Sequence, residues 1–308
     1  MRTKHRRFQE SVPQHLYIRG ARRQTIFFEE LDRLVYLMAF STTARKTGII
    51  ILALAVMFDH LHSIGIFQNR EQMADFERNH LSYFALAYNQ DAGRKGSLFE
   101  KAYGNAPKWT PKKIKSAIIY VGNNQVEKQL CEKAEEHRWN LIAYLKSDHP
   151  YSPPIERKKA SAQLRRCLKT VDSFVGQNTV IPYRVLRRLF GGLTALESEQ
   201  LTDYIVSHYN PIDKKAVLSF FDGSYEQYLL ALHSTTGNDF DIKEDLKIPS
   251  DIPYVQLITI CKHSIFKDNL KTIQGAPQER KKEIADYLLT HTDASPYEIG
   301  KFLDMGGG

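Results

Sequence analysis

The run "GIIILALAVMFDHLHSIGIF", residues 48–67, constrains the fold of this chain more than any other segment. Its continuous apolar part covers residues 48–58, which is shorter than the ~20 residues that cross a bilayer. A short run rich in Ile, Val and Leu favours buried strands. We therefore expect two strands, or one long strand bent at its middle, in a soluble intracellular protein.

Helical spacing flanks this run on both sides. Apolar residues of 29–47 recur at helical spacing up to Gly48, and a second such pattern in 69–92 ends at Gly93. A third begins after Thr110 as N-cap with Pro111 in its first turn, and we expect an interruption near 122–124. The segments "HLYIRG" and "RRQTIFF" predict a basic strand before the first helix. This order predicts an α+β fold, a ferredoxin-like (RRM-like) antiparallel sheet with helices on one face.

The proline-rich stretch "SDHPYSPPIERKK" marks a change of character near residue 150. We predict two domains, 1–150 and 151–308, the second mostly helical. Its last part, residues 281–305, predicts a helix, a short turn and a helix that starts with Ser295 as N-cap and Pro296. This pattern resembles part of a helix-turn-helix, so the region is either an additional DNA-binding module or a packing or interaction domain.

The charge of the chain favours an anionic partner. The 308 residues hold 43 Lys and Arg against 35 Asp and Glu, a net charge of +8. Basic side chains are concentrated in residues 1–23 and 108–115, but charge alone does not separate nucleic acid from a membrane surface. Three scattered cysteines without CxxC spacing suit a reducing cytoplasm.

Two histidines at the end of the apolar run form a candidate metal site. On a strand, His60 and His62 point to the same face, where two imidazoles could hold one divalent cation. Such a pair also arises by chance, and a buried histidine is more often a core residue. On the third helix, Tyr120 and Asn124 are four residues apart and share one face, although Tyr120 could equally be a core aromatic.

The ordered set of short motifs strengthens the metal interpretation. "YIRGARRQTIF", the HxH pair, "GRKGSLFEKAYG", "YVGNNQV" and "EEHRWNLIAY" follow one another within residues 8–146. This set resembles the HUH single-tyrosine transposases, in particular the REP-associated tyrosine transposases of the IS200-like group. The sequence departs from the family pattern at Asp59, at Gln125 and at Lys101–Tyr103, which leaves open an active enzyme or a domesticated relative.

The resemblance implies roles for four residues. His60, His62 and Asn124 would bind a divalent metal, Mg²⁺ or Mn²⁺, and Tyr120 would be the nucleophile that forms a covalent 5′-phosphotyrosine. A phenol with its ordinary pKa of ~10 is a weak nucleophile, and the charge of the phosphate repels its attack. The metal would offset the charge of the scissile phosphate. Asp59 could orient a histidine, but we expect a solvated residue at the strand end.

Single-stranded or hairpin DNA is the predicted partner. Phosphate contacts are predicted for nine basic residues: Arg19, Arg22, Arg23, Arg94, Lys95, Lys101, Lys112, Lys113 and Lys115. One or two interleaved aromatics are expected to stack on bases, from the candidates Tyr17, Phe27, Phe99, Tyr103 and Trp109. Whether the chain acts as a monomer or as a homodimer, with Tyr120 serving the partner's metal site, stays open.

Two rival functions stay open beside the transposase. A non-catalytic nucleic-acid-binding protein on the same fold would explain the basic residues, although it has no need of all four site residues. A metallohydrolase that uses a water nucleophile would need a carboxylate-rich site, and only Asp59 lies close in sequence.

Overall fold

The computed structural model describes residues 8–100, 102–234, 250–264 and 269–305. Four antiparallel strands form one sheet in the order β2-β3-β1-β4. The strands are β1 (Gln14–Arg19), β2 (Ile50–Val56), β3 (His60–Ile66) and β4 (Gly104–Pro107). The apolar run therefore makes two strands joined by a tight turn. β2 is an edge strand of the sheet, and β3 lies between β2 and β1. β4 was not predicted from the sequence.

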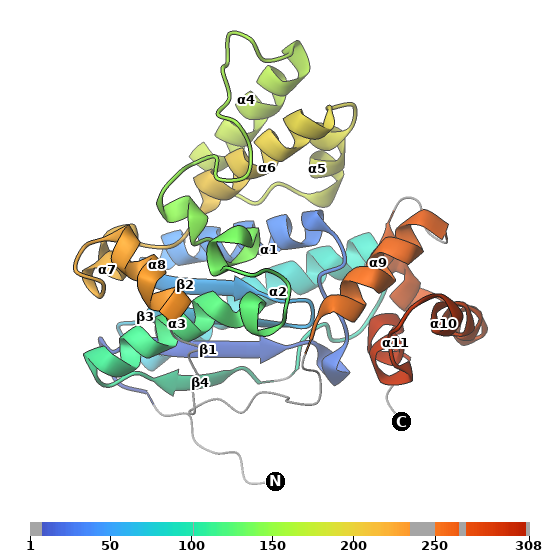
Figure 1. Ribbon diagram of the computed structural model, residues 1–308, viewed down its shortest axis with the longest axis horizontal. Helices are drawn as coiled ribbons and strands as arrows, with labels where there is room; N and C mark the ends of the chain where they lie inside the picture. Colours follow the sequence, from blue (N-terminus) through green and yellow to red (C-terminus); the bar gives the residue numbers. More distant parts are fainter. Residues whose placement is uncertain (1–7, 101, 235–249, 265–268, 306–308) are drawn as a thin grey trace.

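Three helices cover the two faces of the sheet (Figure 1). α1 (Glu30–Thr47) and α2 (Arg70–Ala92) end at Gly48 and Gly93, both in the left-handed conformation that favours glycine. They pack with alternate residues of β1 and β2, including Leu16, Ile18 and Leu54. α3 (Pro111–Glu127) packs on the opposite face against residues such as Ala53 and Ile64. The α+β class is confirmed, with α3 adding cover on the second face.

The third helix follows its sequence signals at one end only. Thr110 caps α3 and accepts a hydrogen bond from the Lys113 amide, as expected. The predicted interruption near Gly122 is absent, because α3 continues to Glu127.

The prediction of a strand in "RRQTIFF" is also wrong: residues 21–23 form a short 3-10 helix and residues 24–28 form no regular element.

The helices after residue 150 pack in three groups against different parts of the sheet domain (Figure 1). The first group shares a core with α1 and α2, the second with α3, and the third with Phe28 and Phe58 beside the β2–β3 turn. These groups are α4 (Ala162–Gly176), α5 (Tyr183–Phe190) and α6 (Ala195–Tyr209); α7 (Lys214–Ser219) and α8 (Tyr225–Ser234); and α9 (Ile252–Ser264), α10 (Gln278–His291) and α11 (Pro296–Leu303). The division near residue 150 stays a prediction. Among the described helices, none is both long and apolar enough to cross a bilayer.

The predicted helix, turn and helix near the end of the chain is confirmed. α10 ends at His291, and α11 begins after Ser295, whose side chain forms a capping box with Glu298. α9, α10 and α11 contact one another and share a core that includes Leu257, Ile284 and Phe302.

Candidate active site

The two histidines lie at the start of β3, on the face that α3 covers. The register pairs His60 with Arg19 and His62 with Tyr17 on β1, so these four side chains share that face. The two rings are perpendicular, with centroids 5.1 Å apart. They are 6% and 1% exposed. A rigid central strand therefore holds both imidazoles in a site shielded from bulk water.

Asp59, in the turn before β3, fixes the first histidine. Its Oδ1 lies 2.6 Å from Nδ1 of His60. Burial by itself would raise the pKa of Asp59, but His60 and Lys301 lower it well below its usual range, so Asp59 is a carboxylate that accepts a hydrogen bond from His60. The expectation of a solvated strand-end residue was wrong, because the carboxylate is enclosed between the turn and α11.

His15 on β1 fixes the second histidine and was missed in the sequence. Its Nε2 lies 3.0 Å from Nδ1 of His62, and His15 is fully buried. Alternation along β1 places His15, Tyr17 and Arg19 on one face, and this period of two was the signal that could have identified it. If His62 donates from Nδ1 to His15, a cation would be bound through Nε2 of His62.

α3 brings the tyrosine and the asparagine to the same face of the sheet. The ring of Tyr120 lies 5.7 Å from that of His62 and 5.8 Å from that of His15, measured between centroids. Nδ2 of Asn124 donates to the main-chain carbonyl of Tyr120 at 3.0 Å. Tyr120 is 3% exposed and Asn124 is 1% exposed. Tyr120 therefore packs beside His62 and His15, and Asn124 is buried one helical turn further along α3.

The donor set fits a divalent cation. Nε2 of His60 and Oδ1 of Asn124 are buried and have no hydrogen-bond partner in the part of the chain that the structure describes. Burying such atoms without a partner costs free energy, which coordination of a cation would offset. Within the same described residues, no three His, Cys, Asp or Glu side chains form a metal cluster. The cluster between β3 and α3 instead combines two imidazoles with an amide oxygen, a ligand that suits Mg²⁺ or Mn²⁺.

Four of the predicted phosphate-binding residues lie on β1 or α3, the elements that carry His15 and Tyr120. Arg19 is half-buried on the histidine face. Lys112 and Lys113 are exposed in the first turn of α3, and Lys113 is seven residues before Tyr120, on the same side of the helix. Lys115 is half-buried, with Nζ 5.0 Å from the centre of the Phe221 ring.

The other predicted phosphate contacts lie elsewhere. Arg22 forms a bidentate ion pair with Asp304, after α11, and Arg94 is 3.7 Å from the same carboxylate with its side chain only 6% exposed. Both arginines therefore hold the C-terminal helices. Arg23 is half-buried and Lys95 is exposed, whereas Lys101 lies outside the described residues.

The aromatic candidates divide in the same way. Phe27 and Phe99 are buried in the core and pack against Phe84, the first stacked and the second tilted. Trp109 is 47% exposed, directly before α3. Tyr17 is half-buried and lies parallel to His62, with ring centroids 6.4 Å apart. Only Tyr17 among these stands beside the histidine pair.

Comparisons with known proteins give one structural similarity. Neither the family models nor the curated proteins searched contain a match. A solved structure described as the REP-associated tyrosine transposase bound to a REP hairpin is similar over 46% of this chain and 82% of its own, with a TM-score of 0.40 and 13% identity. At that level of similarity, the activity has to be inferred from the site itself.

Proposed function

We propose that the protein is a metal-dependent DNA nickase and strand transferase that uses Tyr120 as its nucleophile, as in the HUH single-tyrosine transposases that its sequence resembles. The observation that carries this proposal is that the ring of Tyr120 on α3 packs beside His62 on β3, with His60 next to His62 and Asn124 one helical turn after Tyr120. These two pairs lie about 60 positions apart in the sequence, and each residue type has a defined part in phosphodiester chemistry.

His60, His62 and Asn124 would hold the cation, which when bound supplies charge stabilisation at the scissile phosphate. Asp59 is bonded to Nδ1 of His60, and His15 is bonded to Nδ1 of His62. These bonds orient both rings through Nδ1, on the opposite side of each ring from Nε2. Asn124 is held by its bond to the carbonyl of Tyr120, so the amide and the phenol move together on one turn of helix.

Tyr120 would attack the phosphorus in line with the leaving oxygen. A bond forms between the phenolic oxygen and phosphorus, the bond to the 3′ oxygen breaks, the phenolic proton passes to water, and the leaving oxygen takes up a proton as a 3′-hydroxyl. The 5′-phosphotyrosine keeps the energy of the diester, so a 3′-hydroxyl can reverse the step and rejoin DNA without ATP. The polarity of the cut follows from the resemblance.

Tyr120 is 3% exposed, so some of the side chains that surround it have to move before DNA can reach the phenol. Lys112 and Lys113 at the start of α3 and Arg19 on β1 would guide the phosphates, and Tyr17 would stack on a base. The same burial favours the rival function, a non-catalytic nucleic-acid-binding protein, in which Tyr120 stays in the core.

A covalent-adduct assay separates the two functions. The full chain is incubated in Mn²⁺ with a labelled DNA hairpin, with single-stranded flanks, from the repeats beside the gene, and a denaturing gel detects the protein–DNA adduct. We expect an adduct with the wild type, none with Tyr120→Phe, and near-equal binding by both. Tyr144→Phe is the matched control, since Tyr144 is a buried tyrosine bonded to Asp203 outside the site. An adduct with Tyr120→Phe would show that another residue is the nucleophile, and no adduct with the wild type would leave only binding.

A further inference from the structure

The C-terminal helices reach the candidate active site through one buried lysine. Nζ of Lys301, on α11, lies 2.7 Å from Oδ2 of Asp59, while Oδ1 of the same carboxylate binds His60 at 2.6 Å. The three side chains are 7%, 14% and 8% exposed. A continuous chain of charge-assisted hydrogen bonds thus joins a residue near the end of the sequence to a candidate metal ligand.

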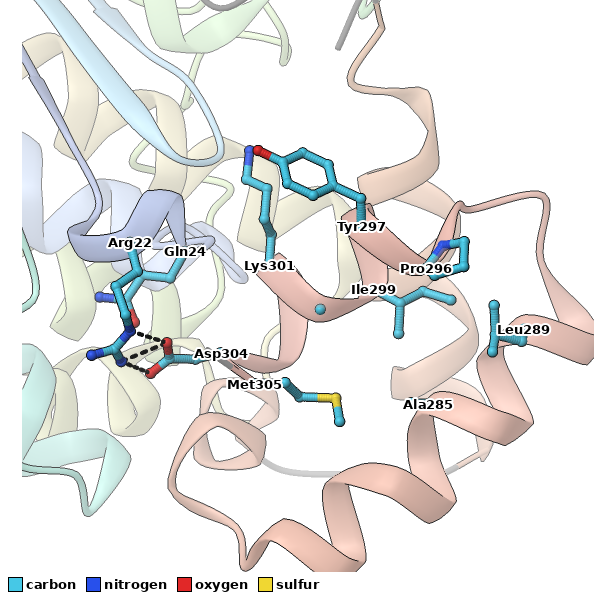
Figure 2. Close-up of a pocket in the computed structure, with 11 residues that line it drawn as sticks. Arg22, Gln24, Ala285, Leu289, Pro296, Tyr297, Ile299, Lys301, Asp304 and Met305 are labelled. Carbon is cyan, nitrogen blue, oxygen red and sulfur yellow. Dashed lines mark hydrogen bonds and ion pairs between the residues drawn. The ribbon is translucent and has the colours of Figure 1, made fainter. Parts of the chain in front are cut away.

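Lys301 is held in place from several sides. Its Nζ lies 5.5 Å from the centre of the Tyr254 ring and 5.8 Å from that of Tyr297, and its carbonyl accepts a hydrogen bond from the amide of Thr25. Figure 2 shows it on α11 beside a cavity of about 380 Å³ that Arg22, Asp304 and Met305 also line. The ammonium group therefore has a fixed approach to Asp59.

Docking of these helices does not depend on this contact alone. Asp304 pairs with Arg22 and Arg94, and Phe302 packs on Phe28 with ring centroids 5.0 Å apart. A buried ammonium is costly to desolvate, and an apolar side chain would serve packing equally well. The specific effect of a lysine at position 301 is on the carboxylate that binds His60.

We propose that Lys301 is a positioning residue of the candidate metal site, acting through Asp59 on His60. By holding Oδ2, it keeps Oδ1 directed at Nδ1 of His60 and shares the negative charge of the carboxylate. His60 then donates from Nδ1 and presents the lone pair of Nε2, the buried atom without a hydrogen-bond partner in the described residues. This inference rests on the proposed function for its metal, but the arrangement of His60 is testable without one.

The first measurement uses the metal-free full chain with ¹⁵N-labelled histidine, and NMR identifies the protonated ring nitrogen of His60. The spectrum of His60→Gln assigns the signals. We expect the Nδ1-protonated form in the wild type and in Lys301→Arg, and a mixture of forms in Lys301→Met. Asp304→Asn is the control: it weakens the pairs with Arg22 and Arg94 but leaves Lys301 and Asp59 in place. If Lys301→Met does not fold, Lys301→Gln takes its place.

The second measurement is calorimetric titration of the same variants with Mn²⁺ alone. We expect Lys301→Met to bind Mn²⁺ ~10-fold more weakly, the usual size of such an indirect effect, and Asp304→Asn to bind as the wild type does. An unchanged His60 signal and a Kd within about twofold of wild type in Lys301→Met would overturn the proposal. If the wild type binds no Mn²⁺ but His60 still responds to Lys301, the proposed function fails and the positioning role stands.

Discussion

Nε2 of His15 lies 3.0 Å from Nδ1 of His62, in a hydrogen bond that crosses from β1 to β3. The bond ties a candidate ligand to the neighbouring strand, so that His62 keeps one orientation whether or not a cation is bound. The two candidate ligands are thus supported differently: His60 by a carboxylate and a lysine, His62 by the imidazole of His15.

Replacing His15 should weaken metal binding without removing a ligand. We expect His15→Phe, which keeps a flat buried ring, to raise the Kd for Mn²⁺ at least ~10-fold, because His62 loses the partner of its Nδ1. His80→Phe is the control, since His80 is a buried histidine between α1 and α2. Calorimetric titration measures both, and equal affinity of His15→Phe and wild type would show that the strand alone orients His62.

Gly104 determines where Tyr17 lies. A Cβ at position 104 would be 2.0 Å from Cζ of Tyr17, so the ring rests on the backbone of β4 beside His62. Stacking on a base contributes ~1–3 kcal/mol, so we expect Tyr17→Ala to weaken binding of single-stranded DNA by ~5- to 100-fold and Tyr17→Phe to bind nearly as the wild type does. Gly104→Ala should match Tyr17→Ala in a fluorescence anisotropy titration. Full affinity of Gly104→Ala would mean that the ring has no part in binding.

The first turn of α3 should account for part of the salt dependence of DNA binding. Each phosphate contact on a single strand contributes ~0.7 to the slope of log K against log salt. The double variant Lys112→Gln/Lys113→Gln should therefore lower that slope by ~1.4. Arg165→Gln/Arg166→Gln removes the same charge from exposed positions on α4, at the opposite end of the molecule from β4 (Figure 1), and should leave the slope unchanged. Equal slopes for the two double variants would count against α3 as the binding element.

Asp251 should make the protein less stable at neutral pH. Burial and the charge of Asp59 raise the pKa of this carboxyl to about 6 from its ordinary 3.8. The folded state holds the proton more tightly than the unfolded state, so stability falls as the pH rises from about 4 to 6 and then levels off.

The stability of Asp251→Asn tests this at two pH values. A difference of about two pKa units corresponds to ~3 kcal/mol, so the variant should gain about that free energy of unfolding at about pH 7.5 and roughly a third of it at about pH 4.5. Urea denaturation measures the gain, with the exposed Asp286→Asn on α10 as control. A gain that does not change with pH would contradict the assignment.

Local patterns in the sequence were sufficient for strands β1, β2 and β3 and for several helix caps. Gly48, Gly93 and Thr110 act where expected, because their signals depend on neighbours within a few residues. Strand alternation likewise placed His60 and His62 on one face, and helical spacing placed Tyr120 with Asn124. The prediction that the two pairs act together came from a family resemblance, because no local rule sets the distance between a strand and a later helix.

Contacts between distant segments were not predictable in this way. Asp59 was predicted to be a solvated residue at a strand end, since the lysine that encloses it stands 242 positions later. Arg22 and Arg94 were predicted to contact phosphates, because nothing near them in the sequence indicates that they pair with Asp304. β4 has only four residues, two of them Gly and Pro, and forms because β1 offers it an edge.

The three groups of helices after residue 150 determine how the site can be studied. Because they pack against α1, α3, β2 and the β2–β3 turn, a shortened protein ending at that point would bring residues such as Ala53 and Phe58 into contact with solvent. We expect such a fragment to aggregate, so that its inactivity would say nothing about Tyr120. Point substitutions in the intact chain are the informative route.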